Sequence, residues 1–558
     1  MKGVITIVKI SDLVDRTIET FAPIWALKRE RARVTMQAVR AFRNSGYSHS
    51  GASTTKNSLR GWISTSRSPQ EDVGNNLALL RERSRDLYMS GGLAASAINK
   101  SKSNVLGPGL TLKCQLNYRA LGLTPQQAKE WEEKTEYEFE LWASSKIDHT
   151  GLHDFYDCQR VMLTGWLLNG DSLAVVKYAE RPDVKNPYLL RLHMIEADRL
   201  CTPDSLSSAL AGIDGSLSME YVELDNGHRI YNGVETDSSG KVVAYYICNQ
   251  YPQSLLPSRR PVSWQRVEAI NYITGLPNVL FIVQPERAEQ YRGVPYLAPV
   301  IEELKQMTRY TEAEITAAII NSFFTAFITS EGPTNELPFG DSIEESQQLQ
   351  LSPEERLNSY ELGPATINVL GPGEKVTFGE PKHPVSGFEQ FMKTMAQLVG
   401  AALDMPYEML LGVFNSSYSA SRAALLQAWR PFRDRRDWFA YEFCQPVYET
   451  WLWEAVATGR IQAPGFFTDP MRRKLWSQAI WIGPSPGQID PVKEVQAAAL
   501  RIKYRFSTHE REAMELTGMD YDNNVDVLRR EYEAANGLPD VNITLPQEGG
   551  EKDDAKED

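Results

Sequence analysis

The segment GVPYLAPVIEELKQMTRYTEAEI, residues 293–315, decides how this 558-residue chain is organised. Its apolar side chains recur every three or four residues, at Leu297, Val300, Ile301, Leu304 and Met307. The charged side chains occupy the other faces, at Glu302, Glu303, Lys305, Arg309 and Glu312. This period is that of an amphipathic α-helix. The segment therefore predicts one long helix over residues 296–324.

A small inserted lobe and a second helix are expected after this segment. Residues 330–373 are rich in Pro, Gly and Glu and carry a short strand signal at Thr366–Leu370. A second amphipathic helix is predicted over residues 387–403. Its apolar face comprises Phe388, Phe391, Met392, Met395, Val399, Ala402 and Leu403. Pro406 ends this helix, because a residue before proline avoids the helical conformation.

A third helix of about forty residues is predicted from Tyr418 onward. Pro431 and Pro446 should kink it, because proline lacks the backbone donor. Its aromatic surface exceeds what one helix can bury against its own subunit, so we expect burial between subunits for part of it and core packing for about half. The aromatic residues concerned are Trp429, Phe432, Trp438, Phe439, Trp451 and Trp453. A further helical segment is expected at about 490–535.

Residues 75–290 predict a single α+β domain. Helices are expected from Asn75 toward Val105, at about 125–143 and at about 153–168. The strands predicted from the sequence are Ser172–Tyr178, Leu189–Ile195, Tyr221–Leu224, Arg229–Val234, Val242–Cys248 and Val279–Val283. Asp225-Asn226-Gly227 indicates a hairpin with a type I′ turn, which needs positive φ at both central residues.

The composition excludes several classes of protein. A formal charge of −13 argues against a protein that binds polyanions in bulk. The five cysteines form no Cys-x-x-Cys pair, which argues against a disulfide framework and favours a reducing compartment. No stretch reaches the roughly 18 uncharged apolar residues of a membrane span. Lys9 and Asp12 interrupt what would be a signal peptide's core, so a soluble, non-secreted protein without membrane contact is expected.

Motifs for enzymatic chemistry are scarce, and no cofactor is predicted. The sequence lacks a G-x-x-x-x-G-K-S/T phosphate loop and an H-E-x-x-H zinc motif. Gly483-Pro-Ser485-Pro-Gly487 resembles a nucleophile elbow, but Pro486 has no N–H for an oxyanion hole. His149 and His153, with nearby aspartates, leave open a metal-dependent nuclease or hydrolase. Capping of a helix that starts near Phe155 accounts better for Asp154.

Residues 1–74 read as an N-terminal arm. Lys28–Arg43 contains six basic residues and one acidic residue, and a Ser/Gly/Thr-rich linker follows. A mobile arm is the simplest interpretation, while contact with DNA or with a scaffold partner remains an alternative. In that alternative the chain would be a capsid scaffold component. The acidic residues 541–558 are expected to be a disordered tail.

Several segments, in collinear order, resemble the portal proteins of tailed bacteriophages, in particular the lambda-like family. On the N-terminal side they are LLRERSRDLYMSGGLAASAI at 79–98, VLGPGL at 105–110, LLNGDSLAVV at 167–176 and IEADRLCTPD at 195–204. They continue with residues 293–315, LGPGEKV at 370–376, the block at 404–432 and DPVKEVQAA at 490–498. The resemblance spans about residues 75–534.

This resemblance implies an α+β portal fold that assembles into a ring of about twelve copies. It divides the chain into the following parts: an arm at 1–74, a wing at 75–290, a first stem helix at 291–329, a clip at 330–376, a second stem helix at 377–404, a tunnel loop at 405–420, a long kinked helix with the rest of the wing at 421–484, a crown at 485–540 and a tail at 541–558.

The implied function is that of a DNA channel at one capsid vertex, in the virion and, during assembly, in the host cytoplasm. The implied partners are other copies of the chain, double-stranded DNA in packaging and ejection, the terminase large subunit, head–tail adaptor or neck proteins, and the major capsid protein with its scaffold. Members of the family are not enzymes. A channel should not hold phosphates tightly, and an acidic subunit agrees with that requirement.

The resemblance also suggests particular site residues. The tunnel loop facing DNA would comprise Gly412, Val413, Phe414, Asn415, Ser416, Ser417 and Tyr418, while the sequence alone leaves a plain helix–helix connection as the alternative. A basic cluster that faces either a neighbouring subunit or DNA would comprise Arg422, Arg430, Arg433, Arg435 and Arg436. On the stem, the charged residues are Glu302, Glu303, Lys305 and Arg309. No catalytic residue and no metal ligand is assigned.

Overall fold

The computed structural model divides the chain into two units, Met1–Ser68 and Pro69–Asp558. It describes residues 28, 31–32, 57–59, 62, 64–180, 186–203, 221–252, 254, 260–322, 326–330, 374–378, 387–413, 418–486 and 491–535. For 320–322, 326–330, 374–378, 418–421 and 535 this description covers the backbone alone. In its described residues the first unit contains helical backbone at 28 and 31–32 and a short 3-10 turn, η2 (Asn57–Leu59), and the elements described below belong to the second unit.

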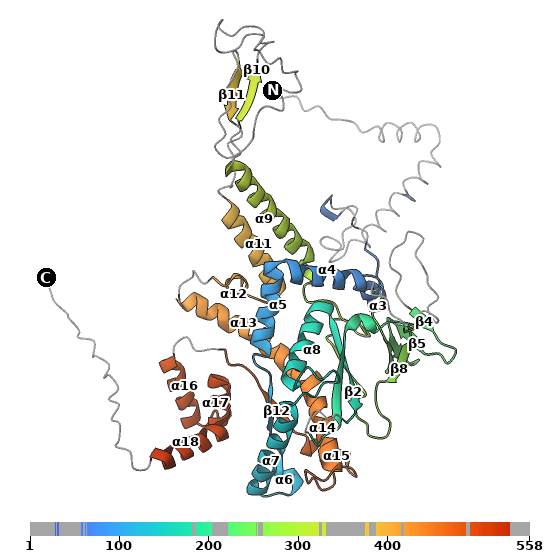
Figure 1. The fold of residues 1–558 in the computed structure, drawn as a ribbon, viewed down its shortest axis with the longest axis vertical. Helices are drawn as coiled ribbons and strands as arrows, with labels where there is room; N and C mark the ends of the chain where they lie inside the picture. Colours follow the sequence, from blue (N-terminus) through green and yellow to red (C-terminus); the bar gives the residue numbers. More distant parts are fainter. Residues whose placement is uncertain are drawn as a thin grey trace, which may run out of the picture. The chain divides into compact units, whose positions relative to one another are not determined.

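Helices open the second unit, including a short helix at 69–74 within the range predicted as the arm (Figure 1). They are α3 (Pro69–Gly74), α4 (Leu77–Ser90), α5 (Gly92–Val105), α6 (Tyr118–Leu121), α7 (Pro125–Ala143) and α8 (Phe155–Asn169). A capping box between Thr124 and Gln127 starts α7. Asp154 accepts a hydrogen bond from the Asp157 N–H at 2.7 Å and caps α8, which confirms its predicted role.

Two antiparallel sheets follow α8. The three-stranded sheet has the order β3-β2-β9, with β2 (Asp171–Tyr178), β3 (Leu190–Ile195) and β9 (Val279–Val283). The five-stranded sheet is a meander of β4 (Tyr221–Glu223), β5 (Arg229–Tyr231), β6 (Val234–Thr236), β7 (Val242–Cys248) and β8 (Trp264–Glu268). The mixture of helices and sheets confirms the predicted α+β class.

The strand predictions need two corrections. Residues 229–234 form two strands, because a left-handed turn at Asn232 and Gly233 separates β5 from β6. The hairpin at 225–227 is present, but its turn is not type I′. Only Gly227 of the three loop residues has a positive φ, 78°, and Leu224 pairs with His228 across a three-residue loop. Such loops combine a type I turn with a left-handed glycine.

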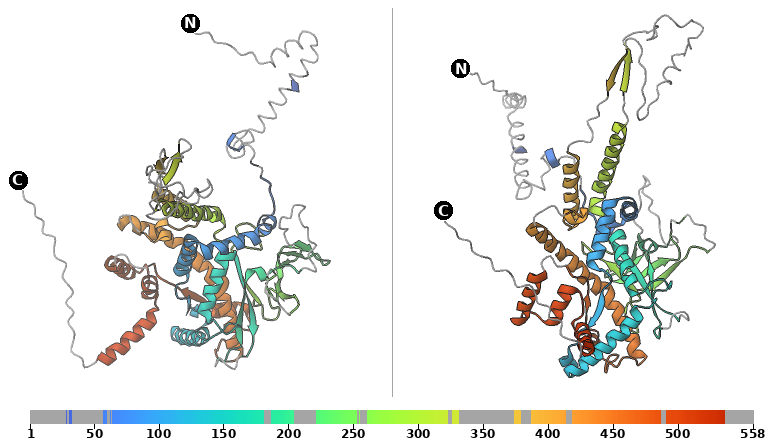
Figure 2. Two further views of the ribbon diagram at one scale, coloured as in Figure 1. Left: turned by 45° about the horizontal axis from the view of Figure 1, so that its top comes forward. Right: turned by 60° about the vertical axis from the view of Figure 1, so that its left-hand side comes forward.

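Two helices and a strand pair form a hairpin-like excursion of the chain. After the 3-10 turn η4 (Ala298–Val300), α9 (Ile301–Ser322) runs outward, and α11 (Phe388–Ala402) returns beside it (Figures 1 and 2). Tyr310 of α9 contacts Phe391 of α11, with ring centroids 5.0 Å apart. Between the helices, β10 (Ala326–Ser330) pairs antiparallel with β11 (Glu374–Phe378). The strand predicted at 366–370 lies outside the described residues.

The predicted forty-residue helix is present and contains one irregularity. It consists of α13 (Tyr418–Phe439), the π-helical turn η6 (Ala440–Cys444) and α14 (Gln445–Ala457). The Gln445 N–H reaches back to the Ala440 carbonyl, a five-residue step. The π turn thus lies just before Pro446, where proline would otherwise disturb the regular ladder. The short helix α12 (Tyr407–Leu411) precedes α13.

The C-terminal part contains one strand and four further helices. After α15 (Pro470–Trp476), β12 (Ala479–Ile482) pairs antiparallel with β1 (Thr111–Cys114) and joins sequence-distant segments. The helical segment predicted at 490–535 is three helices, α16 (Pro491–Lys503), α17 (His509–Thr517) and α18 (Tyr521–Ala535). Among the described residues, no helix combines the length and apolar character needed to cross a membrane.

One large core joins the helices with one side of the three-stranded sheet, and a smaller core lies between the two sheets. The large core absorbs the aromatic residues of α13 and α14. Phe432, Phe439 and Trp451 are fully buried, and Trp429, Trp438 and Trp453 pack against them. Core packing therefore accounts for three of the six residues, while Trp429, Trp438 and Trp453 remain partly exposed in the single chain, and their burial between subunits stays a prediction. All five cysteines are buried and unpaired.

Candidate functional site

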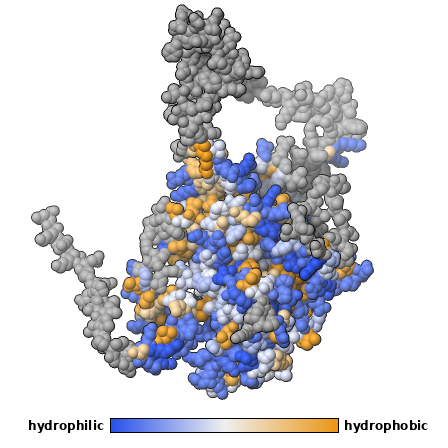
Figure 3. Space-filling view, viewed as in Figure 1, coloured by the Kyte–Doolittle hydropathy of each residue, from blue (hydrophilic) through white to orange (hydrophobic). Residues whose placement is uncertain are grey.

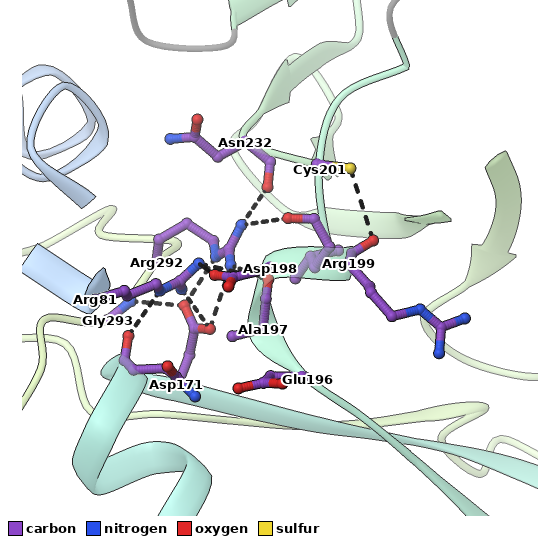
Figure 4. Close-up of polar contacts among 12 residues, drawn as sticks. Arg81, Asp171, Glu196, Ala197, Asp198, Arg199, Cys201, Asn232, Arg292 and Gly293 are labelled. Atoms are coloured by element: carbon purple, nitrogen blue, oxygen red, sulfur yellow. Dashed lines mark hydrogen bonds and ion pairs between the residues drawn. The ribbon is translucent and has the colours of Figure 1, made fainter. Parts of the chain in front are cut away.

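A buried network of charged residues lies where α8, β2 and the start of the α9 excursion meet (Figure 4). Asp171, the first residue of β2, is enclosed by two arginines. Its Oδ1 lies 2.7 Å from Nη2 of Arg81, which α4 supplies. Its Oδ2 lies 2.8 Å from Nε of Arg292 and accepts the Gly293 N–H at 3.0 Å. One carboxylate therefore ties α4 and the segment before α9 to the sheet.

The two arginines extend the network to backbone carbonyls. Arg81 Nε donates to the Asn169 carbonyl at 2.9 Å, at the end of α8. Arg292 donates to the carbonyls of Ala197 at 3.0 Å and Leu200 at 2.8 Å, around the 3-10 turn η3 (Ala197–Arg199). Such forked contacts suit the planar guanidinium group and satisfy most of its donors. Every segment that the network touches is thereby held in one arrangement.

The network remains charged although it is buried. The side chains of Asp171, Arg81 and Arg292 are at most 4% exposed. Burial alone would raise the pKa of Asp171, but Arg292 and Arg81 outweigh it and lower that pKa. Burial lowers the pKa of Arg81 to about 10, so this side chain keeps its proton at neutral pH. The adjoining cavity at Arg292 has about 10 Å³, room for about one water molecule. The site can hold elements together but cannot admit a substrate.

Two glycines allow the backbone to pass close to the network. Gly170 ends α8 with φ 86°, and its carbonyl oxygen would lie 1.8 Å from a Cβ at Gly293. A Cβ at Gly170 would in turn lie 2.4 Å from the Gly293 carbonyl carbon. Real Cβ atoms do not approach so closely, and φ values of this kind favour glycine. The backbone of the Gly-Asp-Ser sequence that begins at Gly170 therefore crosses, at close distance, that of the Arg-Gly-Val-Pro sequence that begins at Arg292.

The network explains four of the sequence segments quoted above. Arg81, Asp171, Ala197 and Gly293 come from residues 79–98, 167–176, 195–204 and 293–315. Sequence reasoning identified these segments but assigned none of the network residues to a site. The available signal was a charged residue beside glycine in apolar surroundings, at Asp171 and at Arg292.

The predicted tunnel loop is described at its two ends. Gly412 ends α12 in the left-handed conformation, with φ 72°. Val413 is 48% exposed. Phe414, Asn415, Ser416 and Ser417 lie outside the described residues, and Tyr418 is the first residue of α13.

The predicted arginine cluster divides into two groups. Arg435 stacks over the Tyr296 ring at 4.7 Å and lies 3.6 Å from Asp404. Arg436 donates to the carbonyls of Asn104 and Val105, both at 2.9 Å, and so caps the end of α5. Burial lowers the pKa of Arg436 to about 10. These two arginines bind within the chain.

The remaining arginines face outward. Arg430 and Arg433 are exposed and have no ion-pair partner within the described part of the chain. Arg422 is half-buried and lies 3.7 Å from Glu494 of α16. For these three arginines, contact with a neighbouring subunit and contact with DNA both stay predictions.

The charged residues predicted on the first long helix lie on α9 as expected. Glu302 and Arg309 are exposed, and Glu303 is half-buried. Glu302 accepts a hydrogen bond from Gln306 at 3.0 Å. Lys305 Nζ lies 3.8 Å from Asp86 of α4. Exposed pairs of this kind contribute little stability.

The residues considered for a metal-dependent enzyme serve the local fold. Asp148 accepts the His153 N–H at 2.8 Å within its own loop. The rings of His149 and His193 lie with their centroids 4.9 Å apart and their planes tilted by 44°. Within the described residues, no group of three or more His, Cys, Asp or Glu side chains is placed to hold a metal ion.

Comparison with known proteins decides the family. The family model described as phage portal protein, lambda family, matches residues 55–436, more than half of the chain. The chain belongs to this portal family. This portal protein is 23% identical over 492 residues to the portal protein of Escherichia phage N15, covering 85% of this chain and 88% of the relative. It is 23% identical over 493 residues to portal protein B of Escherichia phage lambda, covering 85% and 87%.

Solved structures of low similarity also align with this portal protein. The neck of an empty gene transfer agent particle matches with a TM-score of 0.43 and 13% identity, covering 78% of this chain and 92% of that chain. An HK97-family phage portal protein from Corynebacterium diphtheriae matches with a TM-score of 0.28 and 11% identity, covering 60% and 83%.

Proposed function

We propose that this portal protein assembles into a ring of about twelve copies at one capsid vertex and forms the channel for DNA packaging and ejection. The observation that carries the proposal is the family match over residues 55–436. The α9–α11 hairpin supports it as well. With 22 residues, α9 is about 33 Å long, a length suited to lining a channel.

We assign the parts of the ring to the elements described above. Residues 75–290 and 421–484 form the wing, and α9 and α11 form the stem. The clip is 330–376, with β10 and β11 at its base. The tunnel loop lies within 405–420, and α16–α18 form the crown at 485–540. The arm at 1–74 and the tail at 541–558 complete the subunit.

Exposed apolar residues on the stem helices support contact between neighbouring copies. Figure 3 shows apolar surface over α9 and α11, where few other elements cover them. The large apolar residues concerned are 47–57% exposed: Ile315, Ile319, Phe391 and Leu398. A ring requires head-to-tail contacts between two different surfaces of the subunit. Helix faces of this kind are suited to one side of such a contact.

Charge supports a conduit that does not hold DNA tightly. A chain with a formal charge of −13 repels a polyanion on average. Arg430 and Arg433 are exposed on α13, the helix that follows the tunnel loop, and could centre the duplex weakly. We assign no enzymatic activity to the ring. The clip would contact the terminase large subunit and then adaptor or neck proteins, while the wing would contact the capsid protein and its scaffold.

Two experiments test this function. Negative-stain images of the purified protein should show rings with a central hole, and a strictly monomeric particle at every salt concentration would contradict the proposal. Replacement of Phe414 and Asn415 by glycine should reduce DNA packaging or genome retention while rings still form. Packaging at the unaltered level would remove the tunnel-loop assignment.

A further inference from the structure

An open cavity of about 240 Å³ is lined by residues from both sheets of the proposed wing. Near the centre of the sheets the gap is filled by the smaller core, which includes Leu173, Tyr245 and Val279. The cavity is lined by residues from β2, β3, η3 and the β7–β8 hairpin: Val175, Lys177, His193, Ile195, Arg199, Ile247, Cys248, Asn249, Ser263, Trp264 and Gln265.

The lining combines an apolar wall with basic groups. Val175, Ile195 and Ile247 belong to the smaller core and form the apolar part. Lys177 and Arg199 are basic, and among the described residues that line the cavity none is acidic. This is unusual for a chain with 72 acidic and 59 basic residues. Converging polar groups above an apolar wall are typical of binding sites.

The basic groups retain free donors. Arg199 points away from the Asp171 network (Figure 4), and its Nε donates to the Cys248 carbonyl at 2.9 Å. Its two Nη atoms and the Lys177 ammonium group have no partner within the described residues. A ligand with a negative charge would supply the missing partner.

The basic groups of the cavity contribute to a lowered pKa of His193, although burial is the larger cause. Burial lowers its pKa to about 4, and His149, Lys177 and Arg199 contribute in the same direction. The imidazole is therefore neutral at physiological pH. An anion bound between Lys177 and Arg199 would offset their effect and raise the pKa of His193, which gives a direct measure of occupancy.

The adjoining strand points to a peptide. Within the described residues β8 is the last strand of its sheet, and Trp264 and Gln265 of β8 line the cavity. An edge strand can pair with an extended peptide through its free backbone groups, while pockets beside it select side chains. The lining includes neither a helix N-terminus nor a glycine-rich loop, the features that commonly bind phosphate.

We propose that this cavity binds an acidic, partly apolar peptide segment of a protein partner, with a carboxylate between Lys177 and Arg199 and an apolar side chain against Val175, Ile195 and Trp264. The peptide would extend the five-stranded sheet at β8. This inference goes beyond the ring and the DNA channel, because it concerns the wing and does not depend on assembly.

A binding experiment with defined probes tests the proposal. The probes are a fluorescent extended peptide of alternating valine and glutamate, the same peptide with glutamine for glutamate, and inorganic phosphate. With the full chain we expect binding of the glutamate peptide, at least tenfold weaker binding of the glutamine peptide, and no displacement by millimolar phosphate. Equal binding of both peptides, or displacement by phosphate at low concentration, would overturn the assignment to an acidic peptide.

Variants locate the site. Lys177→Met should weaken binding of the glutamate peptide about tenfold, and Arg199→Met should do the same. Lys241→Met is the matched control, because Lys241 is exposed on the β6–β7 turn and lies outside the cavity. Unaltered binding by Lys177→Met and Arg199→Met would place the peptide elsewhere and refute the proposal.

A spectroscopic measurement does not depend on any of the basic-residue variants. In protein with ¹³C-labelled histidine, the resonance missing from His193→Gln identifies the ring, and its pKa is read from a pH titration. Saturation with the glutamate peptide should raise this pKa toward the ordinary histidine value. A pKa that stays near its starting value while the peptide is bound would contradict the proposed position of the carboxylate.

Discussion

At the residue scale, Asp171 has the largest expected effect on stability. It lies between Arg81 and Arg292, and its removal would leave two buried arginines facing each other. Loss of one partner from a buried ion pair typically costs about 3–5 kcal/mol. We therefore expect Asp171→Asn to lower the free energy of unfolding by about that amount, as measured by denaturant titration.

The matched control is Asp86→Asn on α4. Asp86 is 62% exposed and lies 3.8 Å from Lys305, so its replacement should change stability by less than about 1 kcal/mol. Similar losses for the two variants would show that burial of the network does not determine its contribution.

Gly293 provides a second prediction at this scale. A Cβ there would overlap the Gly170 carbonyl oxygen. Because this oxygen belongs to the backbone, no side-chain movement can relieve the clash. Gly293→Ala should therefore reduce the yield of folded protein or lower its melting temperature by at least several degrees. Gly92→Ala in α5 is the control, because its Cβ meets no atom within 4 Å. A Gly293→Ala protein as stable as the Gly92→Ala protein would contradict the crossing.

The pairing of these residues was beyond prediction from the sequence. Asp171 and Arg292 are 121 positions apart, and Asp171 and Arg81 are 90 apart. Local periodicity carries no information about such contacts, whereas Asp154 was predictable as a cap because its partner is three residues away. Arg435 and Arg436 show the same limit, since charge pattern alone could not separate them from Arg430 and Arg433.

At the element scale, the spacing of apolar residues predicted the long helices but did not reveal strands whose apolar and polar residues alternate weakly. The stripes on α9 and α11 are strong, and their bounds agree with the sequence within a few residues. β8 has the sequence WQRVE and β12 the sequence AIWI, and neither shows a clear alternation with turn signals on both sides. β12 exists because β1 pairs with it across more than 360 residues, a tertiary effect.

A polar cluster that joins β1, α7 and the residues before α18 leads to a prediction about pH. Lys113 of β1 lies 2.7 Å from Asp520 and 3.5 Å from Glu136 of α7. Burial raises the pKa of Glu136 to about 7, although Lys113 and the Cys114 N–H oppose the shift. A raised acid pKa contributes stability below the unfolded-state value, and this contribution is lost as the pH rises through about 7. Between about pH 4.5 and 8, the titration of Glu136 should lower the unfolding free energy of the unaltered protein by up to about 3 kcal/mol. Glu136→Gln should abolish this decrease.

Unfolding free energies measured across this pH range test that prediction. Glu133→Gln serves as the control, because Glu133 is on the same helix with a side chain 56% exposed. The control should follow the pH dependence of the unaltered protein, whereas Glu136→Gln should show a flatter curve. If the Glu136→Gln curve coincides with that of the control, Glu136 does not titrate as proposed.

At the scale of the whole molecule, the acidic charge is compatible with a conduit. A ring of about twelve chains, each at −13, would carry about −156, and its average field would repel duplex DNA. Arg430 and Arg433, on the helix after the proposed tunnel loop, could then act locally, over about the 8–10 Å that salt screening permits. Composition therefore excludes a tight DNA binder without excluding a passage for DNA.

The division of the chain into two units gives a last prediction. Pro69–Asp558 contains both hydrophobic cores, the buried network and all elements assigned to the wing, stem and crown, whereas Met1–Ser68 is a separate unit. Deletion of residues 1–48 should therefore leave ring assembly intact, because the described residues that make up both cores all belong to Pro69–Asp558. Size-exclusion chromatography with negative-stain imaging of the truncated and full-length proteins would measure this, and thermal unfolding would confirm that the truncated chain is folded. A truncated chain that folds but no longer forms rings would instead support the alternative in which Lys28–Arg43 directs assembly through a scaffold partner or DNA.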